Sequence, residues 1–169
     1  MEMRDFIQAG LDRVRQATLK ALDGLNQYEL MWRPGPEANS IGLVLFHAAR
    51  SEDQYVQSRI QGKPQVWETE KWYEKMDLPA GELGYGYTAE QCASFRVPEG
   101  RDLLAYAEAV RTRTMDYVKG MSPDKFDKII NTPRGDLAIG VYLANMVVHL
   151  AQHAGEIAYI RGLQRGLNK

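Results

Sequence analysis

Cysteine and histidine are scarce in this 169-residue chain, which contains one cysteine and three histidines. The single cysteine, Cys92, excludes an intrachain disulfide, which suits a protein of the reducing cytosol. The chain begins Met-Glu-Met-Arg-Asp-Phe, without the apolar run of a signal peptide, and no stretch approaches the ~20 apolar residues of a membrane span. We therefore expect a cytoplasmic protein.

The chain also lacks an excess of charge of either sign. It has 21 lysines and arginines against 22 aspartates and glutamates, so its formal net charge is −1. This balance gives no broad electrostatic basis for binding nucleic acid or an anionic membrane. With 44% hydrophobic and 25% charged residues, the chain has the composition of an ordinary globular protein. Its length suits a single domain over residues 1–169 with a buried core.

No convincing set of alternating strands and no internal repeat is present, whereas long segments have helical periodicity. The expected helices cover residues 4–25, 39–61, 98–120 and 136–164. A loop over 26–39 separates the first two, and its Trp-Arg-Pro-Gly-Pro stretch excludes regular structure there. These four segments predict an all-α protein with the architecture of a four-helix bundle.

The connection between the second and third expected helices is the longest irregular stretch, over residues 63–97. A connection of this length usually has a function or carries short helices. Thr88-Ala-Glu-Gln91 fits a capping box and predicts a short helix through Phe95. Tyr85 and Tyr87, in a glycine-rich part of the loop, are candidates either to roof a pocket or simply to pack on the helices. Ser122 similarly predicts the start of a short helix, and residues 129–135 predict a turn or short extended piece.

The pattern with the clearest chemistry is His149-Leu-Ala-Gln-His153 in the last expected helix. Residues four apart lie ~40° apart on one helix face, so their imidazoles can bind one metal ion. His47 lies in the apolar first half of the second expected helix. Three imidazoles on zinc, nickel or ferrous iron would leave positions open for water or substrate, as in a catalytic site. The alternative is that all three are core histidines with satisfied hydrogen bonds.

Glu156 lies on the same helix face, ~20° from His149 and three residues after His153. It is a candidate to orient an imidazole, to accept a proton from bound water, or to supply a fourth ligand. The alternative is an ion pair with an arginine such as Arg161 or Arg50. A ferritin-like di-iron site is set aside, because neither histidine of the pair has a glutamate three residues before it. Cys92 has no local activating motif and is expected to be a half-buried thiol.

Three features of the chain resemble the DinB-like superfamily of metal-dependent proteins. The first is Trp32-Arg-Pro-Gly-Pro followed by Ser40-Ile-Gly-Leu-Val-Leu-Phe-His47, and the second is His149-Leu-Ala-Gln-His153-Ala-Gly-Glu-Ile. The third is the order of four helices with a long connection between the second and third. Together these features span nearly the whole chain.

The resemblance implies a four-helix bundle of up-down-down-up type, often a homodimer. It also implies a divalent metal, commonly nickel or zinc, held by His47, His149 and His153. Relatives of known activity are thiol-dependent transferases that use bacillithiol or mycothiol, and a related maleylpyruvate isomerase. The main departure is Glu156, where the family often has glutamine; an acidic group there adds negative charge near the metal.

The first functional hypothesis is a metal-dependent thiol S-transferase, in which a low-molecular-weight thiol attacks an electrophilic small molecule as the thiolate. Arg33, Arg50 and Arg134 are candidates to bind carboxylates of this thiol, although solvated surface arginines are commoner. A hydrolase using metal-bound water fits the same ligands. A hypothesis of another class is a non-catalytic, stress-associated metal-binding protein that acts through its dimer surface.

Overall fold

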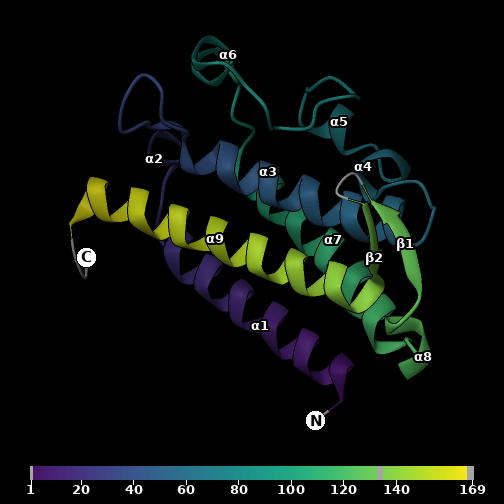
Figure 1. Cartoon of the computed structure of the whole chain (residues 1–169). Helices are drawn as coiled ribbons and strands as arrows, with labels where there is room; N and C mark the ends of the chain where they lie inside the picture. Colours follow the sequence, from purple (N-terminus) through teal and green to yellow (C-terminus); the bar gives the residue numbers. More distant parts are fainter. Residues whose placement is uncertain (1, 133–134, 167–169) are drawn as a thin grey trace.

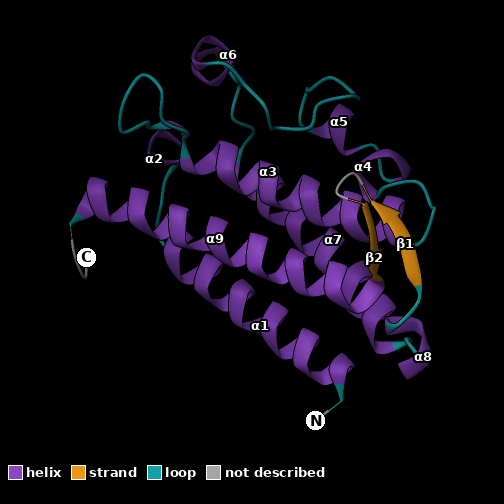
Figure 2. Cartoon of the chain, in the orientation of Figure 1, coloured by secondary structure: helices purple, strands orange, loops and turns teal. Residues whose placement is uncertain are grey.

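The computed structural model describes residues 2–132 and 135–166, in which four long helical segments lie side by side (Figures 1 and 2). They are α1 (Met3–Leu22), α3 (Ile41–Asp53) with its continuation η1 (Gln54–Ile60), α7 (Gly100–Lys119) and α9 (Ile139–Arg165). The expected helical class is therefore correct, and all four predicted long helices are present. None of the described helices is long and apolar enough to cross a membrane.

Each long helix packs against two of the others. Both α1 and α3 contact α9 and α7, so the core lies between all four. The side chains of α9 that face this core are spaced three, four and seven residues apart, as a helix buried along one face requires. They include Leu143, Met146, Leu150 and Ile157, each at most 4% exposed.

Capping residues set where several helices begin. The Ser40 side chain accepts a hydrogen bond from the backbone N–H of Leu43 at the start of α3. Thr88 does the same for Gln91 at α6 (Ala89–Ser94), which confirms the predicted capping box. The predicted helix near Ser122 is also present, as α8 (Pro123–Phe126).

The end of the second long helix has an unexpected hydrogen-bond register. The segment η1 is a π-helix, in which for example the Gln61 N–H donates to the Val56 carbonyl oxygen. The sequence predicts one continuous helix over 39–61. The π-helical part has only seven residues, which is too short for its different period to change the spacing of apolar residues. Such π-turns are rare and often lie near functional sites.

The long connection carries α4 (Val66–Thr69), α5 (Trp72–Lys75) and α6, and a buried carboxylate attaches it to α3. Asp53 is fully buried, and its two oxygens accept hydrogen bonds from the backbone N–H groups of Val66 and Trp67, each at 2.9 Å. The Tyr106 hydroxyl donates to the same carboxylate at 2.8 Å. All of these polar groups are buried and hydrogen-bonded, so they fix the start of the connection against α3.

Two boundaries differ from the sequence predictions. The predicted loop over 26–39 begins with a short helix, α2 (Gln27–Met31), which Asn26 and Glu29 cap reciprocally. The last helix was predicted from Asp136, but that residue lies in β2 (Gly135–Ala138), which pairs antiparallel with β1 (Ile129–Thr132). The helix starts at Ile139 because Asp136 pairs with Asn131 across the hairpin and so stays extended.

Candidate metal centre

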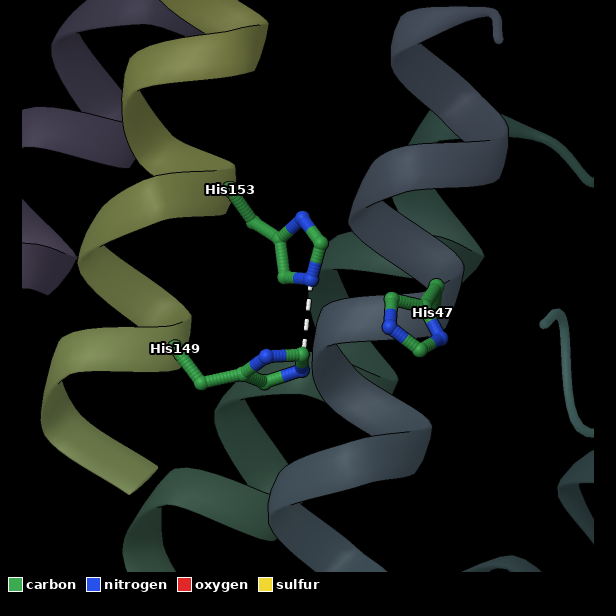
Figure 3. Close-up of side chains that lie close together, drawn as sticks. All are labelled: His47, His149 and His153. Carbon is green, nitrogen blue, oxygen red and sulfur yellow. Dashed lines mark hydrogen bonds between the residues drawn. The ribbon is translucent and has the colours of Figure 1, made fainter. Parts of the chain in front are cut away.

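The three histidines of the chain come together between α3 and α9 (Figure 3). His149 and His153 project from adjacent turns of α9 toward α3, which carries His47. One ring nitrogen of each histidine lies within 4.8 Å of the other two. The Nε2 atoms of His149 and His153 are 3.2 Å apart. The fold therefore joins a local pair to a residue about a hundred positions away, as the sequence predicts.

These distances fit a single metal ion. Zinc–imidazole bonds are about 2.0–2.1 Å long, so two nitrogens on one tetrahedral ion lie roughly 3.3–3.5 Å apart. The 3.2 Å separation of His149 and His153 is close to that value, and His47 needs only a small movement to join them. Among the described residues these three histidines form a group that could hold an ion.

Glu156 lies against the opposite side of the His153 ring from this cluster. Its Oε2 atom is 2.7 Å from His153 Nδ1, while His153 Nε2 faces His149. When Nδ1–H donates to the carboxylate, the Nε2 lone pair is left pointing at the cluster. This is the arrangement by which carboxylates orient metal-binding histidines.

His47 is half-buried, and its environment favours the uncharged imidazole. Burial lowers the pKa of His47 to about 4, and the neighbouring His153 and His149 contribute in the same direction, while the Leu83 backbone acts against them. Its Nδ1 is buried without a hydrogen-bond partner, and its Nε2 lies 3.4 Å from the Ser51 hydroxyl. At neutral pH this imidazole is therefore in the form that binds metals.

A pocket of about 240 Å³ opens onto the histidines. Polar groups in its wall, besides the two histidines that reach it, come from Asn39, Tyr85, Tyr87, Cys92 and Glu156. The described lining includes no lysine or arginine. The Tyr85 ring lies edge-on to His47, with 6.0 Å between the ring centres. A small molecule in this pocket would contact the histidine cluster directly.

One glutamate organises the loop that covers the pocket. The Glu82 carboxylate accepts hydrogen bonds from the backbone N–H groups of Leu83 and Gly84, at 2.9 and 3.2 Å, and from the Tyr87 hydroxyl. Gly84 has a φ of +73°, and a Cβ there would lie 2.8 Å from Phe46, so only glycine fits. The position of Tyr87 in the pocket wall therefore depends on Glu82, whose role no sequence pattern indicates.

Two of the three predicted thiol-binding arginines lie away from the pocket. Arg33 donates from Nε to the Ala38 carbonyl at 2.7 Å and also donates to the Pro36 carbonyl. These bonds hold together the loop that contains Arg33. Arg50 is 4% exposed and donates to the Glu82 carbonyl at 3.0 Å, with further bonds to Gln65 and Tyr106. This placement gives no support to their predicted role.

The remaining sequence predictions for this region have mixed outcomes. Arg134 lies outside the described residues. Cys92 is half-buried, as expected, and its Sγ atom is 3.4 Å from the Asn39 side-chain oxygen at the pocket wall. The one available signal for the loop was its spaced glycines, since Gly84 and Gly86 both have positive φ angles.

The fold and the histidine cluster together define a helical protein with a candidate three-histidine metal site. The family model described as DinB superfamily matches residues 10–157, and the chain belongs to this superfamily. A solved structure described as the conserved protein of locus from Enterococcus faecalis is similar, with 24% identity and a TM-score of 0.84. The match covers 96% of this chain and 97% of that one, and at this identity it shows the fold alone. A comparison with curated proteins finds no match.

Proposed function

We propose that this protein is a divalent-metal-dependent enzyme that acts on a small molecule, with His47, His149 and His153 as the metal ligands. The observation that supports this most directly is the convergence of one nitrogen from each histidine beside a pocket of about 240 Å³. Three imidazoles leave coordination positions for a substrate, and nickel, zinc and iron all accept such ligands. A bound ion would supply a Lewis acid that lowers the pKa of a thiol or water.

The protein's own groups have separate tasks in this proposal. Glu156 holds the His153 ring with Nε2 toward the cluster, and can accept a proton from His153 Nδ1. His47 stays uncharged, so that no proton must be displaced from it at neutral pH. The loop of Glu82 to Tyr87 forms part of the pocket wall, where Tyr85 and Tyr87 can contact a substrate.

Transfer of a low-molecular-weight thiol, of bacillithiol or mycothiol type, is the first candidate reaction. Membership of the DinB superfamily and the sequence resemblance to thiol-dependent transferases support it. This proposal assigns no thiol-binding role to Arg33 and Arg50, because their guanidinium groups donate to backbone carbonyls of the protein itself. Hydrolysis uses the same ligands and remains the alternative reaction.

The test is a reaction screen with matched protein forms. Zinc- and nickel-loaded wild type is incubated with each thiol and a panel of electrophiles, and thiol loss and product mass are measured. His153→Ala serves as the control that lacks one ligand. We expect metal-dependent thiol consumption in the wild type alone. Absence of both thiol transfer and hydrolysis in every metal-loaded form would contradict the enzymatic proposal.

A non-catalytic metal-binding protein that acts through a partner surface is the second candidate. The exposed apolar side chains of α9 favour it: Val141, Val148, Tyr159 and Leu163 are at least 50% exposed. In that case the metal would stabilise the fold without turnover. The reaction screen separates the two candidates, because both predict metal binding and only one predicts product.

We also propose that the four long helices form an up-down-down-up bundle in a cytoplasmic homodimer. The helix directions support the topology, since α1 and α9 run from right to left in Figure 1 and α3 and α7 from left to right. The four exposed apolar side chains of α9 support the dimer, because exposed apolar residues that gather on one face often mark an interaction site.

A further inference from the structure

A second cavity, partly open to solvent and lying between the four long helices, also reaches His153. Its volume is about 60 Å³, and all four long helices contribute to its wall. Of the residues that line it, His153 is the one shared with the pocket described above. The His153 imidazole thus lies between the polar pocket and this second cavity, whose wall is mostly aliphatic.

Small side chains keep this second space open. Ala48 and Ala49 of α3, Ala107 of α7 and Ala154 of α9 lie in its wall, where larger apolar residues would fill it. An unfilled cavity destabilises a folded protein in proportion to its volume. Four alanines from three helices therefore leave a space that larger side chains would fill, at a cost in stability, if this part of the core had only a structural role.

The wall of the cavity offers apolar contacts and no unpaired charge among its described residues. The Arg111 guanidinium makes two hydrogen bonds of 2.8 Å to the Glu52 carboxylate. Arg15 Nε similarly lies 2.8 and 3.0 Å from the two oxygens of Glu108. The rest of the wall is aliphatic except for Thr18 and His153. This largely aliphatic wall favours contact with apolar molecules.

The Arg15–Glu108 pair between α1 and α7 is a solvent-exposed part of the wall. These two side chains are 43% and 42% exposed, whereas Glu52 is 4% exposed. Solvent-exposed ion pairs hold their geometry weakly. The pair can therefore separate to admit a ligand without disrupting the buried pair of Arg111 and Glu52.

We propose that this cavity is a binding site for a small uncharged apolar molecule, of a few carbon atoms or a similar volume, that contacts the His153 imidazole. The site goes beyond the proposed function and does not require a metal. An occupant would pack against the ring that Glu156 orients, so binding here would alter the histidine cluster through direct contact.

Xenon is the probe that tests this site. The protein is labelled at leucine and isoleucine methyl groups, and their NMR shifts are followed as xenon pressure rises, in the absence of metal. We expect saturable shifts at Leu104, Leu150 and Ile157, which line the cavity. Shifts that rise linearly and spread over methyl groups elsewhere would overturn the proposal.

Two variants of α7 provide the matched comparison. Ala107→Met places a flexible side chain into the cavity and should abolish the saturable shifts, whereas Ala105→Met changes an exposed position of the same helix and should keep them. Saturable shifts that persist in folded Ala107→Met would also overturn the proposal.

An enlarging variant covers the case in which Ala107→Met does not fold. Leu104→Ala widens the cavity and should allow benzene to bind and raise the melting temperature, with no such rise in wild type. A Leu104→Ala protein that binds neither xenon nor benzene would overturn the proposed binding site. The metal proposal would be unaffected, because none of these measurements involves a metal.

Discussion

At the residue scale, the metal proposal depends on which nitrogen of His153 carries hydrogen. The 2.7 Å contact with Glu156 favours hydrogen on Nδ1 and leaves Nε2 as the metal-binding atom. The same contact makes Glu156 a positioning residue, because its carboxylate lies on the far side of the ring from the other histidines.

Glu156→Gln tests this positioning role. The amide oxygen can still accept a hydrogen bond from Nδ1, but the negative charge that raises the basicity of the ring is lost. We expect zinc affinity to fall about 10-fold, against a far larger fall in His153→Ala. Titration against a competing chelator measures both, with the exposed Glu37→Gln as control. Equal affinities in Glu156→Gln and wild type would show that the carboxylate has no such role.

The lowered pKa of His47 predicts how the metal-free protein responds to acid. Between pH 6.5 and about 4 the unfolded chain protonates this histidine, while the folded protein does not. The free energy of unfolding should therefore decrease as pH falls through this range. Urea denaturation at several pH values measures the slope, which should be smaller in His47→Gln. An identical slope in both proteins would contradict the assignment.

At the element scale, the buried carboxylate of α3 determines where the long connection begins. Asp53 bonds two backbone N–H groups of α4 and the Tyr106 hydroxyl of α7, and Arg50 lies 3.7 Å from it. The same Arg50 bonds the carbonyl of Glu82, where the pocket loop starts. This network links the helical core to the cover of the candidate site.

Asp53→Ala should therefore be strongly destabilising. It leaves the N–H groups of Val66 and Trp67 buried without partners, and removes the carboxylate beside Arg50. We expect a loss of about 3 kcal/mol in the free energy of unfolding. Urea denaturation compares it with Asp116→Ala, an exposed position expected to change little. A loss no larger than that of the control would mean that the network adds nothing to stability.

At the scale of the whole molecule, the candidate site was predictable in part. His149 and His153 follow from helical spacing, and His47 joined them because its helix segment is apolar enough to be buried against α9. The pocket loop was not predictable, because Glu82 acts through backbone N–H groups whose directions depend on the positive φ of Gly84. The partners of Arg50 were not predictable for a similar reason, since its guanidinium donates to a carbonyl 32 residues away.

The fold was predictable where one pattern extended over several turns. The four long helices follow from apolar periodicity, whereas the hairpin of β1 and β2 has only four residues in each strand and little apolar alternation. The short α2 depends on the reciprocal cap of Asn26 and Glu29, a signal of four residues in a segment whose two prolines predict a loop.

The outer face of α9 predicts the oligomeric state. Val148 is 57% exposed near the middle of this helix, on the same face as the exposed Val141, Tyr159 and Leu163. Val148→Glu should convert a dimer to a monomer, because burial of an unpaired charge in an apolar interface is costly. Light scattering after gel filtration measures the mass, with Glu90→Gln as control. A monomeric wild type would contradict the dimer.

The measurement that tests the central claim most directly is the metal content of protein purified without an affinity tag, for wild type and His153→Ala side by side. The convergence of His47, His149 and His153 predicts about one nickel, zinc or iron per wild-type chain and little in the variant. No metal in either protein, together with no thermal shift on adding divalent ions, would contradict the claim and leave three histidines that only pack in the core.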